Sequence, residues 1–296
     1  MRILIVGKTG QVARELERLR WPEHHTRIQI GRPECDLSDA HAARRIVHES
    51  APDIVVNAAA YTAVDRAESE PELAQKVNRD APAAMAGACA EVGAGFLHLS
   101  TDYVFDGAKA GAYVEDDPVA PLSVYGRTKA EGEAAIREVL ERHVIVRTSW
   151  VFSAFGANFV RTMLRVSSER PEIRVVDDQR GAPTSAGDIA GAILSIVNSW
   201  TPGGGAWGTF HFASAEPTTW YGFAKAIFEL AGRQTKLVPI ATADYKTAAR
   251  RPANSVLNCG RIARRYGIGQ PAWRGALGGV LAEMRGAAEA TRDAPA

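Results

Sequence analysis

Short apolar runs alternate with longer amphipathic stretches through the first 150 residues. The apolar runs are rich in β-branched residues and show no strict apolar–polar alternation, which is typical of strands buried on both faces. Strands are predicted at residues 2–6, 27–30, 53–58, 95–100 and 143–149, with helices at 11–19, 38–49, 71–92 and 124–141. This alternation predicts an α/β fold with a Rossmann-type, doubly wound parallel sheet.

The pattern loosens after residue 150. Strand-like segments at 172–177, 208–214 and 235–240 alternate with helical ones near 185–199, 217–231 and 273–285. The TPGGG stretch at 201–205 is expected to be a surface connector, and the tail 286–296 to be frayed. We predict a dinucleotide-binding domain over 1–150. Residues 151–296 are predicted to form mainly a smaller α/β substrate-binding lobe, interleaved with the first.

A glycine turn opens the chain, because the first strand is followed by Gly7-x-x-Gly10-x-x-Ala13 and then by a helix. Gly7 permits a tight turn, and Gly10 lets a pyrophosphate approach the backbone at the helix N-terminus. Ala13 keeps the helix and strand close. The spacing is typical of the extended short-chain dehydrogenases/reductases, so a dinucleotide cofactor is predicted.

The end of the second predicted strand indicates which dinucleotide is bound. Gly31 and Arg32 stand where an acidic residue would bind the ribose 2′-hydroxyl and an arginine would accommodate a 2′-phosphate. We therefore predict NADPH, with NADH as a possible substitute; the alternative is that Arg32 is a solvated surface residue. After the third strand, the small residues Ala58, Ala59 and Ala60 would let the cofactor lie close.

The amino-acid composition mainly excludes some classes of partner and location. With 35 Lys and Arg against 34 Asp and Glu, the net charge is +1, which gives no reason to propose nucleic acid or a charged membrane as partner. No apolar run is long enough to span a bilayer, and the N-terminus lacks the features of a signal peptide. Cys35, Cys89 and Cys259 are sparse and widely separated, which predicts reduced, buried thiols in a cytoplasmic protein.

Candidate catalytic groups follow the fourth predicted strand, which ends in Ser100, Thr101 and Asp102. Ligands of an open α/β sheet bind outside this carboxyl edge. The next helix carries Tyr125 and Lys129, four positions apart and hence on one face. This set suits carbonyl reduction: Tyr125 gives a proton to the carbonyl oxygen as hydride reaches the carbon, and Thr101 holds the oxygen. Lys129 and the positive charge of the oxidised cofactor are expected to stabilise the tyrosinate left behind.

The same Tyr-x-x-x-Lys spacing recurs at Tyr221 and Lys225. There it lies among Trp220, Phe223 and other apolar residues at helical spacing, and no strand ending in hydroxyls precedes it. We interpret this second copy as a structural helix that Thr218 or Thr219 caps. Position, and not spacing, therefore selects Tyr125.

Longer strings carry a family resemblance: GKTGQVA, NAAAYTAVDRAESEP, STDYVFDG, YGRTKAEGE, VIVRTSWVF, NFVRTML, DDQRGAPT and RRPANSVLN. They run almost end to end, and through them the chain resembles the dTDP-4-dehydrorhamnose reductase family. The resemblance implies NADPH- or NADH-dependent reduction of the 4-keto group of dTDP-6-deoxy-L-lyxo-4-hexulose to dTDP-L-rhamnose, in dTDP-rhamnose and polysaccharide biosynthesis. The alternatives are another nucleotide-sugar epimerase or dehydratase, or a non-catalytic regulatory subunit similar to the methionine adenosyltransferase β-subunit.

The resemblance also implies roles for individual residues. Trp150 would touch the sugar; its sequence position suits stacking on the sugar and burial in a core equally well. The implied catalytic residues are Thr101, Tyr125 and Lys129; the implied cofactor-binding residues include Gly10, Gln11, Val12, Asp36, Leu37, Ala60, Tyr61 and Thr62, with Tyr125 and Lys129; the implied substrate-binding residues are Thr101, Asp102, Trp150, Asn158 and Gln179, and Arg251 is a further candidate.

The resemblance raises one metal question. Some relatives bind magnesium between subunits through glutamates, for which Glu15 and Glu283 are plausible counterparts. The third position falls at Gly187, which has no side-chain ligand. We therefore predict no metal ligands, and either a monomer or a homodimer.

Overall fold

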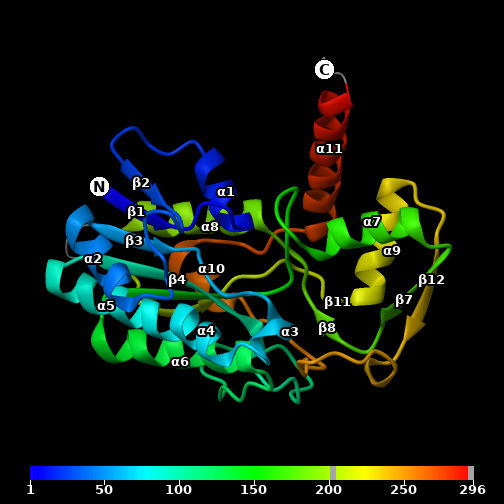
Figure 1. Ribbon diagram of the computed structural model, residues 1–296, viewed down its shortest axis with the longest axis horizontal. Helices are drawn as coiled ribbons and strands as arrows, with labels where there is room; N and C mark the ends of the chain where they lie inside the picture. Colours follow the sequence, from blue (N-terminus) through cyan, green and yellow to red (C-terminus); the bar gives the residue numbers. More distant parts are fainter. Residues whose placement is uncertain (201–204, 293–296) are drawn as a thin grey trace.

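The computed structural model describes residues 1–200 and 205–292 of the 296-residue chain. Its centre is a six-stranded parallel sheet with the strand order β10-β5-β4-β3-β1-β2 (Figure 1). The strands are β1 (Arg2–Val6), β2 (Thr26–Ile30), β3 (Ile54–Asn57), β4 (Gly95–Thr101), β5 (His143–Thr148) and β10 (Gly208–His211). The strand order reverses between β1 and β3. The predicted doubly wound α/β fold is confirmed.

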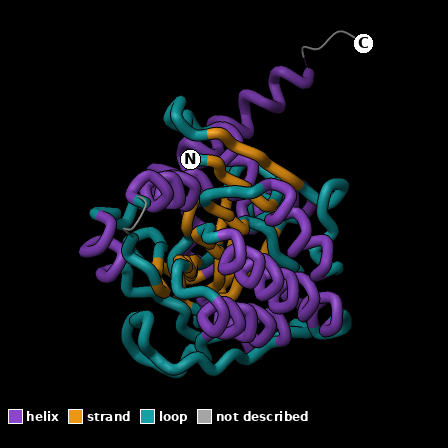
Figure 2. The backbone as a smooth tube through the Cα atoms, turned by 90° about the vertical axis from the view of Figure 1, so that its left-hand side faces the viewer, coloured by secondary structure: helices purple, strands orange, loops and turns teal. Residues whose placement is uncertain are grey.

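Helices cover both faces of the sheet (Figure 2). One face packs against α1 (Gln11–Arg18), α8 (Ala186–Ser199) and α10 (Gly260–Tyr266), and the other against α2 (Ala40–Ser50), α5 (Ala81–Val92) and α6 (Val124–Val139). Successive residues of β1 alternate between the two resulting cores: Ile3 and Ile5 enter one, Leu4 and Val6 the other. This burial on both faces explains why the strands read as continuous apolar runs.

The predicted helix at 71–92 is interrupted. α4 (Pro71–Gln75) passes into a π-helical turn, η1 (Lys76–Asp80), and only then into α5. Pro82 in the first turn of α5 has no backbone N–H to donate, so the regular ladder cannot continue through it. The π turn directs Asn78 inward, where it is fully buried.

After residue 150 the chain builds a smaller lobe and also returns to the main sheet through β10 (Figure 1). The lobe pairs β7 (Glu172–Val176) with β12 (Lys236–Ile240), beneath α7 (Phe159–Glu169), α9 (Trp220–Ala231) and the start of α11 (Trp273–Arg292). Its core contains Phe152, Phe223 and Trp273. The short strands β6 (Val151–Phe152), β9 (Thr184–Ser185), β8 (Arg180–Gly181) and β11 (Thr218–Thr219) pair in two further ribbons.

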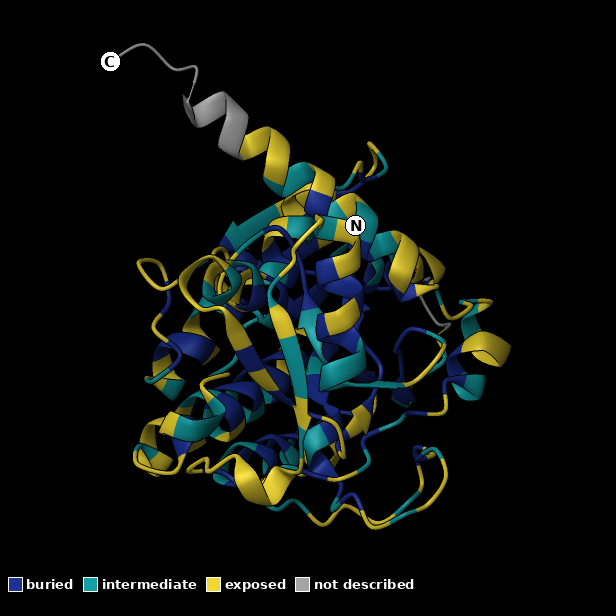
Figure 3. Ribbon diagram, turned by 90° about the vertical axis from the view of Figure 1, so that its right-hand side faces the viewer, coloured by how far each residue is buried: buried dark blue, intermediate teal, exposed yellow. Residues whose placement is uncertain are grey.

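Buried residues gather in the sheet and the inner faces of its helices, and exposed ones along the outer faces (Figure 3). The three cysteines are free and buried, as predicted. Residues 201–204 of the expected connector and 293–296 of the expected frayed tail lie outside the described residues, and α11 continues past its expected end to Arg292. Within the described part of the chain, no helix is both long and apolar enough to cross a membrane.

Candidate active site

The glycine turn lies where the strand order reverses. Gly7 has a φ of 125°, and a Cβ added there would lie 3.3 Å from the Ala13 Cβ and 3.4 Å from the Ala58 carbonyl carbon. Gly10 is the N-cap of α1 and provides no side-chain cap for its first N–H groups. A backbone cradle that side chains would fill, beside free N–H groups, fits a dinucleotide pyrophosphate.

Gln11 links this turn to the smaller lobe. Its Oε1 accepts hydrogen bonds from Asn158 Nδ2 at 3.0 Å and from Ser153 Oγ at 3.2 Å. The Asn158 amide also caps α7, by accepting from the backbone N–H of Arg161. The structure thus joins an expected cofactor residue and an expected substrate residue in one cluster. Val12, in contrast, points into the core and is 7% exposed.

Two cations lie at the end of β2. Arg32 is exposed, and its charge helps to lower the pKa of Asp36, although hydrogen bonds from Ser38 contribute more. Lys8, which the sequence analysis missed, packs against Gly31 and pairs with Glu34. Leu37 is buried.

The loop after β3 is held by two buried asparagines. Asn57 Oδ1 accepts from the Ala59 N–H at 3.1 Å. Asn78 Oδ1 accepts from the Tyr61 N–H at 2.8 Å, and its Nδ2 donates to the Tyr61 carbonyl. These bonds fix the backbone of the segment Ala58–Ala59–Ala60–Tyr61–Thr62 beside the glycine turn. Neither asparagine was singled out from the sequence, where an interior asparagine carries no distinctive signal.

Thr101 ends β4 next to the end of β5. Its hydroxyl donates to Asp102 Oδ1 at 3.0 Å and accepts from the Tyr103 N–H at 3.2 Å. Burial raises the pKa of Asp102 to about 7, against the opposing effect of hydrogen bonds from Ser255 and Thr101. A proton-carrying hydroxyl and a carboxyl group therefore share this edge of the sheet.

Tyr125 stands in the first turn of α6, which Ser123 caps by accepting from the Gly126 N–H at 3.1 Å. Burial raises the pKa of the Tyr125 hydroxyl to about 12, and hydrogen bonding to Thr101 only partly opposes this. Lys129 by itself therefore does not bring this pKa below its ordinary value, and the expected effect of the oxidised cofactor's charge stays a prediction. A tyrosine that stays protonated at neutral pH is in the form that a proton donor requires.

Lys129 is 1% exposed, and its Nζ points to β4. It donates to the Leu99 carbonyl at 2.7 Å and lies 2.9 Å from His98 Nε2. Burial lowers the pKa of Lys129 to about 7, although the Glu133 carboxylate acts in the opposite direction. The amine thus supplies less positive charge to Tyr125 than an exposed lysine would.

A buried ion pair supports the base of this site. Arg147 on β5 donates to both oxygens of Glu133, at 2.9 and 2.6 Å, and the Ser100 hydroxyl donates to the same carboxylate at 2.6 Å. Burial would raise the pKa of Glu133, but the hydrogen bonds and charge of Arg147 outweigh it and hold that pKa below its usual range. The pair ties α6 to β4 and β5.

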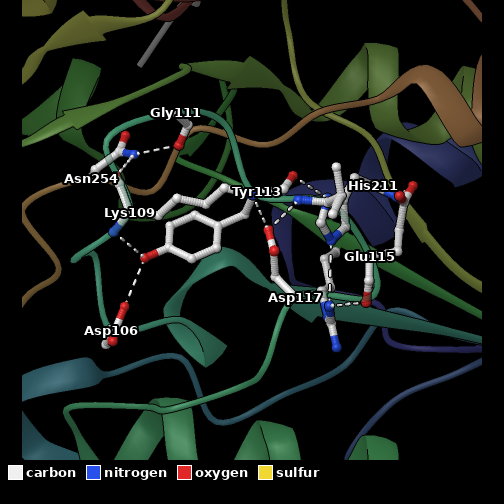
Figure 4. Close-up of polar contacts among 10 residues, drawn as sticks. Asp106, Lys109, Gly111, Tyr113, Glu115, Asp117, His211 and Asn254 are labelled. Carbon is white, nitrogen blue, oxygen red and sulfur yellow. Dashed lines mark hydrogen bonds and ion pairs between the residues drawn. The ribbon is translucent and has the colours of Figure 1, made fainter.

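The long loop between Thr101 and Tyr125 is fixed by a second network (Figure 4). Tyr113 donates its hydroxyl proton to Asp106 at 2.7 Å, and its carbonyl lies 3.1 Å from His211 Nδ1. Asn254 donates to the carbonyls of Lys109 and Gly111. These bonds anchor the loop to β10 and to the segment near residue 254.

Trp150 lies on neither a strand nor a helix and has a positive φ of 47°, which is rare for a bulky side chain. Its ring stacks on Trp220 of α9 at 3.6 Å between ring centroids, and a Cβ at Gly181 would lie only 2.5 Å from it. Backbone strain of this kind is frequent at binding sites, so the partly exposed aromatic stack is a candidate binding surface.

The two remaining expected ligands lie in different surroundings. Gln179 is buried and donates to Thr242 Oγ1 at 3.0 Å. Arg251 pairs with Asp65 at 2.7 Å and lies close to Tyr103, whose pKa it acts to lower. Arg251 therefore approaches the Tyr103–Tyr125 ring pair, which packs edge to face at 5.9 Å.

The second Tyr-x-x-x-Lys copy occupies α9. Thr219 caps this helix by accepting from the Gly222 N–H at 3.0 Å, as expected from the sequence. Phe223 is buried in the smaller lobe's core, and Tyr221 packs against it. Lys225 is exposed and pairs only with Glu229 among the described residues. These contacts favour a structural role for the second Tyr-x-x-x-Lys motif.

The residues expected at a magnesium site do meet, but their chemistry does not suit the metal. Arg18 bridges Glu15 and Glu283, at 3.4 and 2.8 Å, so a guanidinium already takes up the charge of both carboxylates. A Cβ at Gly187 would lie 3.9 Å from Glu15 Oε2, and glycine adds no oxygen ligand there. The described residues contain no group of three or more metal-ligating side chains.

The chain is similar to known proteins over nearly its whole length. Residues 1–286 match the model of the RmlD substrate binding domain family. A dTDP-4-dehydrorhamnose reductase of Sinorhizobium fredii is 46% identical over 92% of this chain and 94% of its own.

Two solved structures with related sequences share the fold. The dTDP-4-dehydrorhamnose reductase of Clostridium acetobutylicum superposes with a TM-score of 0.91 at 35% identity, covering 96% of this chain and 100% of its own. The Bacillus anthracis enzyme, solved in complex with NADP, superposes with a TM-score of 0.89 at 34% identity, covering 95% of this chain and 99% of its own.

Proposed function

This chain belongs to the dTDP-4-dehydrorhamnose reductase family, and we propose that it reduces the 4-keto group of dTDP-6-deoxy-L-lyxo-4-hexulose to give dTDP-L-rhamnose, with NADPH as the hydride donor. The observation that carries the proposal is that Tyr125 hydrogen-bonds Thr101 at the carboxyl end of β4, with Lys129 one turn further along α6. The membership makes the chain an NAD(P)H-dependent oxidoreductase.

Each catalytic residue has a separate task in the proposed reaction. Bound cofactor supplies the hydride to the carbonyl carbon. Tyr125 transfers its phenolic proton to the carbonyl oxygen, so that the ketone gains one hydride and one proton and becomes a secondary alcohol. The Thr101 hydroxyl hydrogen-bonds the same oxygen and orients it. Lys129 would contribute to the cofactor site next to Tyr125, and the Tyr125 phenolate regains its proton from solvent before the next turnover.

The preference for NADPH rests on the end of β2. Arg32 is exposed there, and Lys8 stands beside Gly31. Two cations attract a 2′-phosphate, and Gly31 leaves no acidic side chain to repel it. Glu34 pairs with Lys8 when no phosphate competes. The chain therefore accepts NADH more weakly than NADPH.

The smaller lobe, formed mainly by residues 151–296, is proposed to hold the dTDP-sugar. Trp150 and Trp220 form a partly exposed aromatic stack, which offers apolar surface for a sugar ring. Asn158 bonds Gln11 beside the glycine turn, and Asp102 directly follows β4. Gln179 lies in the smaller lobe and bonds Thr242. We propose that the protein acts in the cytoplasm as a monomer or homodimer.

A direct assay tests the function. The protein is mixed with NADPH and the dTDP-4-keto-sugar, and loss of the reduced-nicotinamide absorbance is followed, with product identified by mass. Tyr125→Phe should lower kcat by about 10²–10⁴-fold, since the proton donor is lost. The matched control Tyr221→Phe, in the twin motif of α9, should keep wild-type activity. Loss of activity in the control but not in Tyr125→Phe would refute the assignment.

A further inference from the structure

A cavity of 330 Å³ lies at the outer edge of the main sheet, between the start of β10 and the helix α10. Trp207, Gly208 and Thr209 line it from the strand side, and Arg264 and Arg265 line it from the helix. Among the described residues β10 pairs only with β5, so no strand covers its other side. The start of β10 is at the amino edge of the parallel sheet, and the cavity is therefore remote from the catalytic edge.

One backbone donor of β10 faces this outer side without an acceptor. Successive residues of a strand direct their N–H groups to opposite sides. The Phe212 N–H donates to the Arg147 carbonyl on β5, whereas the His211 N–H points away from β5 and donates to Glu115 Oε1 at 3.1 Å. Thr209, two residues before His211, directs its N–H to the same outer side. No described residue accepts a hydrogen bond from it there.

The next position along the strand edge shows what such a donor binds. Glu115 accepts from the His211 N–H through Oε1, and its Oε2 lies 3.5 Å from Arg261 Nε on α10. A backbone N–H of β10 and an arginine of α10 thus hold one carboxylate between them. Arg264 and Arg265 lie one turn further along α10, on the same face as Arg261. Within the described part of the chain, neither of them forms an ion pair or hydrogen bond.

Helix position alone does not account for this arrangement. Arg264 and Arg265 are exposed in the last turn of α10, where the terminal carbonyls attract a cation without any ligand. That attraction leaves the Thr209 N–H unpaired, although a backbone donor is stabilised by an acceptor. The cavity therefore combines donors from two elements and lacks the acceptor that Glu115 supplies to the neighbouring set.

The walls of the cavity are held in place by contacts on both sides. The Tyr266 hydroxyl donates to the Ala206 carbonyl, and its ring packs edge to face on Phe210 at 5.1 Å. These contacts tie the end of α10 to the start of β10. The Trp207 ring packs against Trp200 at 4.6 Å between ring centroids. The arrangement of donors is therefore formed before any ligand binds.

We propose that this cavity binds the phosphate group of a small phosphorylated molecule, at a site separate from the catalytic edge. The Thr209 N–H and the guanidinium groups of Arg264 and Arg265 can each donate to a different oxygen of a tetrahedral oxyanion. A volume of 330 Å³ is at the lower end of the range for small-molecule sites and exceeds what phosphate alone needs. The remaining space beside Trp207 would hold one ring, such as the base of a nucleoside monophosphate.

Binding can be measured at the cavity itself, without turnover. In protein labelled with ¹⁵N-threonine, the Thr209 N–H signal is followed by NMR during titration with inorganic phosphate, and Thr209→Val assigns it. We expect the signal to shift saturably, because its proton gains an acceptor, with a Kd of about 1 mM or tighter. A Thr209 signal that does not shift, or that shifts without saturating at about ten times that concentration, would overturn the proposal.

Two variants test the donors on α10. Arg264→Gln and Arg265→Gln should each raise the Kd for phosphate about tenfold or more, because each removes one charge-assisted hydrogen bond. Arg274→Gln is the matched control. Arg274 is also exposed, and its guanidinium lies 4.7 Å from the ring of a tryptophan, Trp273, on another helix. An equal rise in the control would show attraction by overall charge only and would refute the site, as would an unchanged Kd in both test variants.

A second titration separates two sources of the phosphate group. Thymidine monophosphate should bind about 2–10-fold tighter than inorganic phosphate if a base packs on Trp207, whereas equal affinities would assign the site to free phosphate. The Thr209 signal reports on this cavity alone, so a ligand at the catalytic edge does not interfere. If the protein lacks reductase activity yet Thr209 titrates, the proposed function fails and this site stands. An active reductase whose Thr209 signal never responds would mean the reverse.

Discussion

Replacing Gly132 with alanine tests how closely α6 must approach the π turn. An added Cβ would lie 2.2 Å from the Asn78 carbonyl oxygen and 3.3 Å from its carbonyl carbon. Real Cβ atoms essentially never come within 3.0 Å of another heavy atom, and here the obstacle is backbone. The helix must therefore move away by roughly 1 Å, since neither partner has a side-chain torsion that relieves the contact.

Two opposing terms set the expected size of the effect. Glycine to alanine in a helix interior gains about 1 kcal/mol from helix propensity. Overpacking by a methyl group costs about 1–3 kcal/mol, and a backbone obstacle places Gly132→Ala at the upper end. The net loss should be about 2 kcal/mol, a large part of the roughly 5–15 kcal/mol by which a domain is stable.

Gly191→Ala is the matched control. Gly191 also lies inside a helix, α8, and a Cβ there meets nothing within 4 Å. That variant should therefore gain up to about 1 kcal/mol, so the two alanines should differ by about 3 kcal/mol. Urea denaturation followed by circular dichroism gives both free energies of unfolding.

The displaced backbone also has a functional consequence. The Asn78 side chain holds the Tyr61 backbone, so moving the π turn should raise the KM for NADPH in Gly132→Ala but not in Gly191→Ala. The reasoning is wrong if Gly132→Ala is as stable as the wild type, or if the two variants shift the urea midpoint by the same amount in the same direction.

Three further outcomes are expected. Arg32→Ala should raise the KM for NADPH by about 10–100-fold, the loss of one charge-assisted hydrogen bond, and leave that for NADH nearly unchanged; equal effects in steady-state kinetics would contradict the 2′-phosphate role. The pKa of Glu133 is lowered in the folded protein. Its stabilising effect is therefore present above its unfolded pKa of about 4.3 and is lost as pH falls through the folded value. In Glu133→Gln, the free energy of unfolding from urea denaturation should therefore fall less steeply as the pH is lowered. Because Arg18 neutralises the carboxylate of Glu283, a chelator should leave the reductase rate unchanged, and a loss that magnesium restores would count against this.

Local patterns were enough for the sheet, and they also favour Tyr125 over Tyr221, a choice that stays a prediction. The apolar runs of β1 to β5 are short-range signals, and the glycine turn depends on residues only three positions apart. The pairing of β10 with β5 was not foreseen, because the same apolar run fits either lobe. The π turn before α5 was also missed, although Pro82 marks the place where a regular helix cannot continue.

The properties of the site were decided by contacts between distant parts of the chain. Spacing alone puts Tyr125 and Lys129 on one face of a helix. It cannot tell that the amine turns toward His98 and a carbonyl of β4, or that burial raises the pKa of Tyr125. Likewise, the stacking of Trp150 on Trp220 joins two lobes that no local pattern relates.

The amino-acid sequence by itself determined the fold class, the phosphate-binding turn and the order of hydroxyl, tyrosine and lysine, since each depends on periodicity or on residues close in the chain. Only the tertiary structure decided which groups lose water and which way their hydrogen bonds run. Those two factors shift the pKa values of Lys129 and Tyr125, because burial disfavours a charged form and a hydrogen bond favours the form that it stabilises.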